Sequence, residues 1–328
     1  MSVEEELMEP AGPTEPTEPT EPMDPMDAMD AMDLTRLLDL TELTALVERA
    51  RIRVAADRLD TVLRGLGSLV VAFSGGVDST VVLAAAARVL GPRVLAVIAD
   101  SPSLARRELA EARELAASLG VRLVEVATDE LASEGYRRNL GDRCYFCKST
   151  VLAAARRVAD EAGIAHVATG TQADDRRALD RPGLRAAEEL AVVEPLAAAG
   201  IDKAMVRKLA ASWGLPVADK PAAPCLASRI QVGVPVSVAL LGSVERAEEH
   251  VRGYFARNGV PVADLRVRIL LKSFRVEVDA ATMAALEDRA ELKRGVLSGL
   301  STLGLTGPGE LAPYRSGSVG RPSSLSAP

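Results

Sequence analysis

The sequence predicts an α/β protein: a doubly wound parallel sheet followed by a smaller C-terminal α/β domain. The apolar run Leu69–Phe73 leads into a Gly-rich turn and then into an apolar helical stretch. Strand-like and helix-like segments then alternate as far as His166–Thr169, which is typical of a parallel sheet covered on both faces. From about residue 230 the pattern changes to a long helix and two short strands. We therefore expect one domain over residues 34–229 and another over residues 230–328.

Residues 34–66 form the first predicted helix, because apolar side chains recur there at the spacing of one helical face. They are Leu37, Leu38, Leu40, Leu43, Leu46 and Val47. After the Gly-rich turn, the predicted elements are strand 94–98, helix 104–119, strand 122–126, helix 150–162, strand 166–169 and helix 202–213. Gly214 ends the last helix, and residues 216–224 are a Pro-rich connector. The second domain contains helix 238–258, strands 266–271 and 274–278, and helix 281–297.

The chain has 328 residues, of which 48% are hydrophobic, so it can build one large core or two modest ones. No apolar run reaches membrane-spanning length, and no cationic segment precedes an apolar one at the N-terminus. We expect a soluble cytoplasmic protein without a membrane partner.

The first 33 residues are an acidic tail. They contain eleven acidic residues and no Lys or Arg, in Pro-Thr-Glu and Met-Asp repeats without a periodic apolar face. We expect residues 1–33 to be disordered and dispensable for chemistry. The rest of the chain has 39 basic and 35 acidic residues, a net charge of +4. This balance neither demands nor excludes a nucleic-acid partner, but no dense Lys/Arg cluster is visible.

The turn Ser74-Gly75-Gly76-Val77-Asp78-Ser79-Thr80 predicts a phosphate-binding loop at a helix N-terminus. Gly75 and Gly76 tolerate the backbone angles of a sharp turn, and backbone N–H groups and hydroxyls then face the space above the helix. Such a site suits phosphate. The loop lacks the lysine of G-x-x-x-x-G-K-[ST], so it is not the P-loop of kinases and GTPases. The alternative is a turn that merely caps the helix.

Polar or small residues also follow two other predicted strands. Asp100 and Ser101 come after the second strand, and Gly170–Gln172 come after the fourth. Ligands of open parallel sheets bind beyond the carboxyl ends of the strands, so these loops should converge with the Gly-rich turn on one pocket. Asp174 and Asp175 could bind magnesium or ribose there, although acidic residues in loops are usually just solvated.

The chain has three cysteines, Cys144, Cys147 and Cys225, and two histidines. These numbers argue against a Cys₂His₂ zinc finger and against a Ser-His-Asp triad. The first two cysteines form a C-x-x-C, and three thiolates could hold an iron–sulfur cluster with one iron open. A pair of packed thiols and a redox dithiol are the alternatives, although the thioredoxin-like context is missing. We expect His166 to be structural and His250 to be exposed.

Cys225 is also a candidate sulfur nucleophile. It stands close to Ser228 and Arg229, and a nearby cation favours the reactive thiolate. Arg266 and Arg268 alternate on a predicted strand and share one face. Two guanidinium groups on one face suit a phosphate or carboxylate, and the alternative is the solvated face of a half-buried strand.

Together these segments resemble one enzyme family. The matching segments are residues 74–80, 99–102 with 106–108, 143–148, 181–184, 225–229, 266–268 and 314–318. They look like the ATP-dependent sacrificial sulfur transferases that help to build the nickel-pincer nucleotide cofactor of lactate racemase. These enzymes belong to the PP-loop ATP pyrophosphatases, with an adenine nucleotide alpha hydrolase-like fold. The resemblance runs from about residue 60 to 318.

The resemblance implies a reaction. The substrate would be pyridinium-3,5-biscarboxylic acid mononucleotide, whose carboxylates become thiocarboxylates. ATP, with Mg²⁺ present, would adenylate a carboxylate and release pyrophosphate. The adenylate is needed because a nucleophile can displace AMP readily, whereas hydroxide is a poor leaving group. Cys225 matches the cysteine that gives up its sulfur and becomes dehydroalanine. Cys144 and Cys147 depart from the single-cysteine pattern and resemble members in which three cysteines hold a [4Fe-4S] cluster. We favour the cluster, with Cys144, Cys147 and Cys225 as its ligands.

The same resemblance implies binding roles. Ser74, Gly75, Gly76, Asp78 and Ser79 would hold the ATP phosphates, with Asp100 and Ser101 as further nucleotide-binding candidates. Arg266 and Arg268 would grip the substrate phosphate, with Arg229 and Arg315 nearby. The C-terminal domain would serve substrate binding and oligomerisation, and we expect a homo-oligomer.

Two other functions remain open from the sequence. A tRNA thiolase also joins a pyrophosphate loop to a C-x-x-C and a distant third cysteine. Four Phe, four Tyr and one Trp in the whole chain argue against the aromatic, basic surface that RNA recognition uses, so we expect no nucleic-acid partner. A nucleotide-binding protein without turnover is the other possibility. An amidotransferase-type synthetase is less suited, since no glutaminase segment is visible.

Overall fold

The computed structural model describes residues 25–177, 182–221 and 224–315. Residues 1–24 of the acidic tail, Arg181 and residues 316–318 of the resembling segments lie outside the described residues. By internal contacts the chain divides into residues 1–51 and residues 52–328. In the described part of the chain, no helix combines the length and the apolar character needed to cross a bilayer.

Helix α1, Pro25–Leu66, begins at Pro25 rather than at Leu34. Residues 25–33, which we expected to be disordered, belong to this helix. Proline is favoured at the first helical position, and the Met and Ala residues after it are helix formers. The predicted apolar face is exposed at Leu40 and Leu43, whereas Leu59 and Leu63 near the other end are buried in the core.

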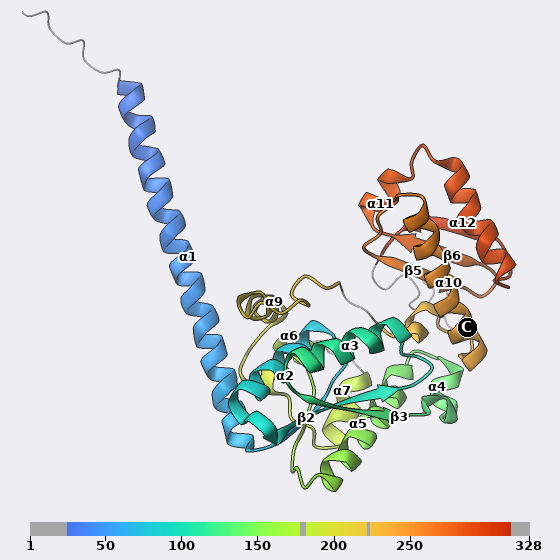
Figure 1. Cartoon of the computed structure of the whole chain (residues 1–328), viewed down its shortest axis with the longest axis horizontal. Coiled ribbons are helices and arrows are strands. Elements are labelled where there is room, and N and C mark those ends of the chain that lie inside the picture. Colours follow the sequence, from blue (N-terminus) through green and yellow to red (C-terminus); the bar gives the residue numbers. More distant parts are fainter. Residues whose placement is uncertain (1–24, 178–181, 222–223, 316–328) are drawn as a thin grey trace, which may run out of the picture. The chain divides into compact units, whose positions relative to one another are not determined.

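A parallel four-stranded sheet forms the centre of the first region (Figure 1). Its strands are β1 Leu69–Ala72, β2 Val94–Asp100, β3 Arg122–Ala127 and β4 Val167–Ala168, in the order β3-β2-β1-β4. Val71 lies opposite Ala96 on β2 and Ala168 on β4. The predicted strands and their parallel pairing are confirmed.

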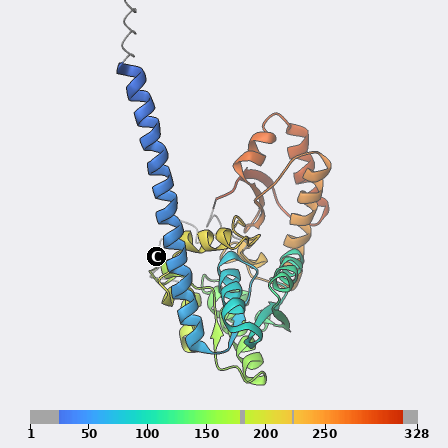
Figure 2. The ribbon, with the colours of Figure 1, turned by 60° about the vertical axis from the view of Figure 1, so that its left-hand side comes forward.

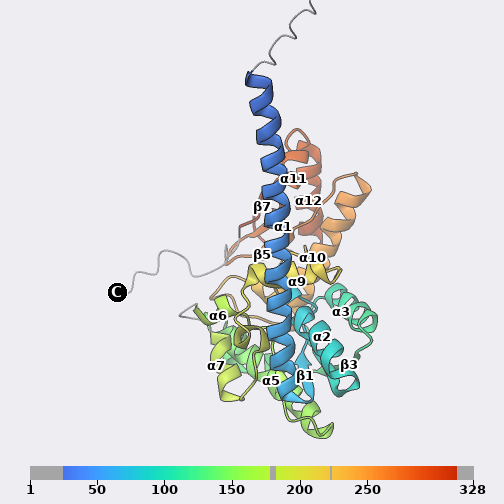
Figure 3. The ribbon, with the colours of Figure 1, turned by 90° about the vertical axis from the view of Figure 1, so that its left-hand side faces the viewer.

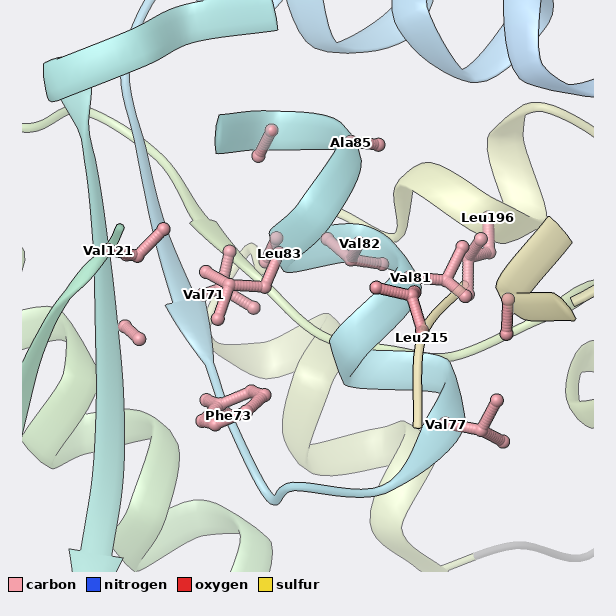
Figure 4. Close-up of a cluster of buried hydrophobic side chains, with 14 of the residues drawn as sticks. Val71, Phe73, Val77, Val81, Val82, Leu83, Ala85, Val121, Leu196 and Leu215 are labelled. Atoms are coloured by element: carbon pink, nitrogen blue, oxygen red, sulfur yellow. The ribbon is translucent and has the colours of Figure 1, made fainter. Parts of the chain in front are cut away.

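Helices cover both faces of this sheet. The helices of the first face are α2 Val77–Leu90, α3 Arg106–Ser118 and α9 Lys203–Ser212, together with the end of α1. Those of the second face are α5 Arg143–Glu161 and α7 Pro182–Glu189. Val71 packs in the first core with Leu83 (Figure 4), and the adjacent Val70 packs in the second core. In Figure 3, α7 and α2 lie on opposite sides of this region. The doubly wound prediction is therefore confirmed.

Short elements connect these layers. They are η1 Gly91–Arg93, η2 Glu130–Ala132, α4 Glu134–Arg138, α6 Ala173–Arg177, α8 Pro195–Ala198 and η3 Leu226–Arg229. Helix α5 begins at Arg143 rather than at Thr150, because no Gly or Pro interrupts residues 143–149. The C-x-x-C therefore lies in the first turns of a helix.

The C-terminal elements form a small mixed sheet with its own core (Figure 2). They are α10 Val238–Arg257, β5 Leu265–Ile269, β6 Phe274–Val278, α11 Ala280–Ala285, α12 Ala290–Thr302 and β7 Gly309–Pro313. β5 and β6 pair antiparallel, and β6 and β7 pair parallel. Strand β7 was not predicted. The predicted helix 281–297 is two helices, because the charged residues Glu287–Arg289 interrupt its apolar face.

Candidate active site

The Gly-rich loop joins β1 to α2 in the way the sequence predicts. Gly75 has φ of +67°, in the left-handed region that favours glycine, and an added Cβ would lie 3.2 Å from the Ala112 Cβ on α3. Gly76 is the N-cap residue of α2, and no side chain caps the helix there. The first-turn N–H groups of α2 therefore lack a side-chain cap, which is the arrangement that receives an anion.

Two hydroxyls of the loop lie close together. The Oγ atoms of Ser74 and Ser79 are 3.2 Å apart, and the Ser74 N–H donates to the Ser79 Oγ at 3.3 Å. The Thr80 hydroxyl donates to the Gly76 carbonyl at 2.8 Å and is buried. Ser74 and Ser79 thus present the hydroxyls at the turn, while Thr80 supports its backbone.

Two residues outside the loop hold it in place. The Lys203 Nζ at the start of α9 donates to both carboxylate oxygens of Asp78, at 2.8 and 2.6 Å. Gly170, after β4, lies so close to α2 that an added Cβ would be 2.6 Å from the Ser79 nitrogen. The sequence placed Gly170 in a loop at the pocket but did not predict its close approach to α2, and it gave Lys203 no role, because both contacts join segments far apart in the chain.

A cavity of about 290 Å³ opens at this end of the sheet. It is lined by Ala72, Ser74, Gly76, Asp78, Ser79, Lys148, Val151, Leu152, Thr169, Gly170, Thr171 and Asp175. The loops after β1 and β4 therefore converge on one pocket, as the sequence predicts. We call it the loop cavity.

The segment at the end of β2, which contains Asp100 and Ser101, does not line the loop cavity. The Asp100 carboxylate accepts a hydrogen bond from the Arg106 Nη1 at 2.6 Å. Ser101 is buried, and its Oγ lies 3.1 Å from the Ser103 Oγ. The predicted part of Asp100 and Ser101 in nucleotide binding stays a prediction, and in the structure they organise the turn that leads to α3.

A second cavity of about 140 Å³ contains Cys225. It is lined by Ser74, Leu104, Ala105, Arg107, Glu108, Pro224, Cys225, Leu226, Arg229, Glu245, Glu248, Glu249 and Arg252. We call it the cysteine cavity. Ser74 of the Gly-rich loop lines both cavities, so this loop and Cys225 are neighbours.

Long-range contacts hold the Cys225 segment beside the loop. The Leu226 N–H donates to the Ser103 carbonyl at 2.9 Å. The Tyr136 hydroxyl donates to the Ser103 Oγ at 2.9 Å from a fully buried position. Burial raises the pKa of Tyr136, with a further contribution from Cys225, so this hydroxyl keeps its proton at neutral pH. Tyr136 and Ser103 thus anchor the cysteine to the turn after β2.

Arg229 fixes the other side of the segment. Its guanidinium donates to the Glu248 carboxylate at 2.9 and 3.3 Å, and both side chains are buried. Its Nη1 also donates to the carbonyl oxygens of Pro224 and Cys225. This side chain, which we predicted near the substrate phosphate, is therefore a neutralised partner of Glu248 that shapes the backbone at Cys225.

The other two cysteines lie at the start of α5. Cys144 is exposed, whereas Cys147 packs in the same apolar cluster as Cys225 and Tyr136. Burial, followed by the charge of Cys225, raises the pKa of both Cys144 and Cys147. Among the described residues, no three Cys, His, Asp or Glu side chains are placed to hold a metal ion. The three thiols share one region without forming a preassembled cluster site.

Arg266 and Arg268 share one face of β5 as predicted, but that face is not solvated. Both are only 4% exposed. Arg268 donates to Glu277 at 3.0 Å, and Arg266 lies 3.5 Å from Asp264. The Tyr314 ring lies over both guanidinium groups, 5.5 and 6.0 Å from their centres.

Arg315 follows Tyr314 and is exposed. His166 is half-buried and was expected to be structural. His250, expected to be exposed, is also half-buried, because its ring stacks on Tyr254 and packs against Gly299 of α12.

Comparisons with known proteins show the family of this chain. A family model described as NAD synthase matches residues 53–156, which include the Gly-rich loop. The pyridinium-3,5-bisthiocarboxylic acid mononucleotide synthase of Lactiplantibacillus plantarum is 33% identical over 224 residues, covering 68% of this chain and 79% of the synthase. The chain belongs to the family of this synthase. The resemblance inferred from the sequence is confirmed.

Two uncharacterised proteins are also similar to this chain. An uncharacterised protein of Synechocystis is 40% identical over 198 residues, which cover 60% of this chain and 74% of that protein. An uncharacterised protein of Methanocaldococcus jannaschii is 26% identical over 198 residues, with the same two shares.

Proposed function

We propose that this protein is an ATP-dependent sulfur transferase of nickel-pincer cofactor synthesis, which converts the carboxylates of pyridinium-3,5-biscarboxylic acid mononucleotide into thiocarboxylates. One observation carries the proposal: Ser74 lines both the loop cavity and the cysteine cavity. A carboxylate adenylated at the loop would therefore form next to the only thiol of the cysteine cavity. The name of the Lactiplantibacillus plantarum relative supports the choice of substrate.

The loop cavity performs the first half of the reaction. A carboxylate oxygen of the substrate attacks the α-phosphorus of ATP, and the bond to the β-phosphate breaks, which releases pyrophosphate. The uncapped N-terminus of α2 and the hydroxyls of Ser74 and Ser79 bind the phosphates. The product is an acyl adenylate whose leaving group is AMP.

Magnesium fits the loop cavity. Asp78 and Asp175 both line it and offer carboxylate oxygens, the ligands this ion prefers. Protein sites usually hold Mg²⁺ through one or two carboxylates and the substrate phosphates, so a third protein ligand is not required. When bound, the ion neutralises phosphate charge. Lys203, which pairs with Asp78, orients that carboxylate.

The cysteine cavity performs the second half. The Cys225 sulfur attacks the acyl carbon, and the bond to the phosphate oxygen breaks with release of AMP. The sulfur remains on the substrate when the bond between Cβ and Sγ breaks and the Cα proton is lost, which leaves dehydroalanine at position 225. Arg229 and Tyr136 position the cysteine for this attack.

The [4Fe-4S] cluster favoured by the sequence has less support. The three thiols are not arranged as a metal site within the described residues. The residues as placed do not fit the cluster, so we derive no step through it. The ligand roles of Cys144 and Cys147, and the homo-oligomer, stay predictions.

One assay tests the proposal. The purified protein is incubated anaerobically with ATP, Mg²⁺ and pyridinium-3,5-biscarboxylic acid mononucleotide, and pyrophosphate and the product mass are measured. We expect pyrophosphate release that depends on the nucleotide, exchange of oxygen for sulfur in the product, and loss of the elements of H₂S from the Cys225 peptide. Repeated turnover by iron-containing protein with intact Cys225 would support the cluster instead. No reaction with this nucleotide, or a new thiol on copurified tRNA, would contradict the proposal.

A further inference from the structure

Helix α1 carries an apolar stripe that is exposed along one face. Leu40, Leu43 and Val47 recur at steps of three and four residues, and Val54 follows seven residues later. Their side chains are between 47% and 59% exposed. Alternating steps of three and four residues keep apolar side chains on one seam of a helix, which is the spacing of coiled coils. We call these four residues the α1 stripe, and its spacing is that of a surface that packs on another helix.

Helix α1 is also much longer than the helices of most globular domains. It is unbroken over 42 residues (Figure 3), whereas the average is about 10–14 residues. Helices of proteins draw most of their stability from the packing of an apolar face rather than from intrinsic propensity, and exposed leucine is unfavourable in water. Covering the α1 stripe would therefore stabilise the helix.

The two halves of α1 carry opposite charge in the sequence. Residues 25–45 contain five acidic residues and one arginine, a net charge of −4. Residues 46–66 contain three acidic residues and five arginines, a net charge of +2. The helix is therefore acidic at its beginning and basic toward its end.

Three arginines in the second half of α1 lack an acidic partner. Arg49, Arg51 and Arg53 are exposed, and within the described part of the chain none of them takes part in a hydrogen bond or an ion pair. The acidic run at residues 25–33 lies on the same helix, at least about 24 Å away along its axis, which exceeds the Debye length of about 8 Å at physiological salt. These arginines are therefore open to the acidic residues of another chain.

A second copy of this chain fits the stripe and the charges together, because it brings the same apolar seam. In a parallel pair of α1 helices, halves of like charge would lie side by side and repel. In an antiparallel pair, the acidic half of each helix lies along the arginine-bearing half of the other. Such a pair is twofold and self-complementary. The charge pattern therefore favours the antiparallel direction.

We propose that α1 pairs with α1 of a second copy in the antiparallel direction, with the two α1 stripes in contact. The acidic run 25–33 and the arginine-bearing run 49–58 have their midpoint near residue 41, so the twofold axis passes close to Leu40 and Leu43. The inference concerns assembly and does not depend on the proposed sulfur transfer.

Single cysteines on α1 test the pairing and its direction in the full-length protein. Thr44→Cys and Ala50→Cys, both at exposed positions, are each treated with a short bismaleimide. The linked peptides are identified by mass spectrometry, so that the three native cysteines are counted separately. In the antiparallel pair, the two copies of residue 44 lie about 9 Å apart along the axis and the two copies of residue 50 about 27 Å. We expect a 44–44 link and no 50–50 link. Both links would show a parallel pair and neither link would show no pair, and each result would overturn the inference.

The α1 stripe is then changed in the Thr44→Cys protein. Leu40→Gln with Leu43→Gln should raise the protein concentration at half-maximal linkage about a hundredfold or more, because four leucine side chains of the pair no longer leave water. Val238→Gln, which removes a similarly exposed apolar side chain from α10, is the matched control. Circular dichroism shows whether each variant keeps its helices. Undiminished linkage in the double variant would overturn the contact between the stripes.

The charges are tested in the same way. Arg51→Glu with Arg53→Glu should weaken the linkage about tenfold, and Arg246→Glu on α10 is the control. Raising the salt concentration from about 0.1 M to about 1 M should weaken the pairing several-fold, because the Debye length falls from about 10 Å to about 3 Å. Linkage that strengthens with salt would show that like charges face each other, which would overturn the antiparallel direction.

An anionic lipid surface is the other partner that suits arginines beside an apolar stripe. Cosedimentation with phosphatidylserine vesicles that is lost in Leu40→Gln with Leu43→Gln, without any 44–44 link, would assign the stripe to lipid and overturn the pairing. Thiocarboxylate formation should be unchanged in this double variant, since the α1 stripe lines neither the loop cavity nor the cysteine cavity. If the wild-type protein forms no thiocarboxylate, the 44–44 link still decides the pairing.

Discussion

The loop at residues 74–80 and the segment at residues 224–229 meet at the cysteine cavity, which Ser74 of the loop helps to line. The two segments are nevertheless held in place differently. The loop takes its shape from residues next to one another: Gly75 supplies the left-handed turn, and Ser74 and Ser79 hydrogen-bond within it. The cysteine segment takes its place from distant partners, namely Ser103 and Glu248. A local motif can therefore be recognised in a sequence, whereas the sulfur position depends on how several elements pack.

This contrast separates the two halves of the proposed reaction. Changes at the loop should reduce both pyrophosphate release and sulfur transfer, because no adenylate forms. Changes that disturb only the cysteine segment should reduce sulfur transfer and spare pyrophosphate release.

The largest effect is expected from Gly170→Ala. The new Cβ would lie 2.6 Å from the Ser79 nitrogen and 2.9 Å from the Asp78 carbonyl carbon, so the loop must shift. Both half-reactions should fall roughly 100-fold, the cost of a displacement near 1 Å in a catalytic site. Pyrophosphate release and product mass are measured in parallel. Gly65→Ala is the control, since its Cβ would meet nothing within 4 Å. Equal rates in the two variants would show that the loop does not need this close approach.

A smaller and selective effect is expected from Arg229→Lys. Lysine keeps the charge but loses the forked contact with Glu248 and the bonds to the Pro224 and Cys225 carbonyls. Sulfur transfer should fall about tenfold or more, while pyrophosphate release stays within about twofold. Arg246→Lys on the exposed side of α10 should change neither rate. If Arg229→Lys lost pyrophosphate release and sulfur transfer to the same extent, the two regions would not act on separate half-reactions.

Tyr136→Phe should have a weaker effect in the same direction. It removes one buried hydrogen bond, the one to the Ser103 Oγ, and so should lower the free energy of unfolding by about 1 kcal/mol. Sulfur transfer should fall a few-fold, as Ser103 gains freedom. Chemical denaturation measures the first quantity. Tyr254→Phe is matched, because no hydrogen bond of the Tyr254 hydroxyl occurs among the described residues. Unchanged stability in Tyr136→Phe would show that the hydrogen bond between Tyr136 and Ser103 does not anchor the cysteine segment.

The smallest effect on activity is expected from Asp279→Ala, which lies in neither region. The Asp279 carboxylate caps α11 through the Thr282 N–H at 2.9 Å. Burial alone would raise its pKa, but hydrogen bonds from Thr282 and the Asp264 and Ala263 N–H groups outweigh this and lower it. The cap therefore stabilises the fold above the unfolded-state pKa, and this contribution is lost as the pH falls through the folded-state pKa.

The wild-type protein should be about 1 kcal/mol more stable than Asp279→Ala at neutral pH, and the difference should shrink in acid. Both half-reactions should be unchanged. Denaturation at several pH values checks this, and a difference that grows in acid would have the wrong sign for a lowered pKa.

The fold was largely predictable because its signals are local. Strand β1, the Gly-rich turn and α2 follow one another in the chain, and Val70 and Val71 show a strand buried on both faces. The start of α1 and the break between α11 and α12 were missed. Residues 25–33 show no apolar periodicity that would have extended α1, and a charged interruption of three residues decides where α11 ends.

The site was predictable only in part. The loop residues, Gly170 and Cys225 were placed at the site, but Lys203 and the walls of the cysteine cavity were not, because they depend on contacts between distant segments. One signal for the cavity was available: Glu245, Glu248, Glu249 and Arg252 fall on one face of a predicted helix, at the spacing of facing residues. The face shared by Arg266 and Arg268 was correct, but their burial beside Glu277 and Tyr314 could not be read from the spacing.

The most direct test of the account compares wild-type protein with Cys225→Ser in one experiment, in which pyrophosphate and thiocarboxylate are measured from the same samples. The central claim is that the loop makes the acyl adenylate and that the sulfur of Cys225 attacks it. We predict that Cys225→Ser still releases pyrophosphate in the presence of the nucleotide and forms no thiocarboxylate. Thiocarboxylate formation by Cys225→Ser, or loss of pyrophosphate release from a folded variant, would contradict the claim.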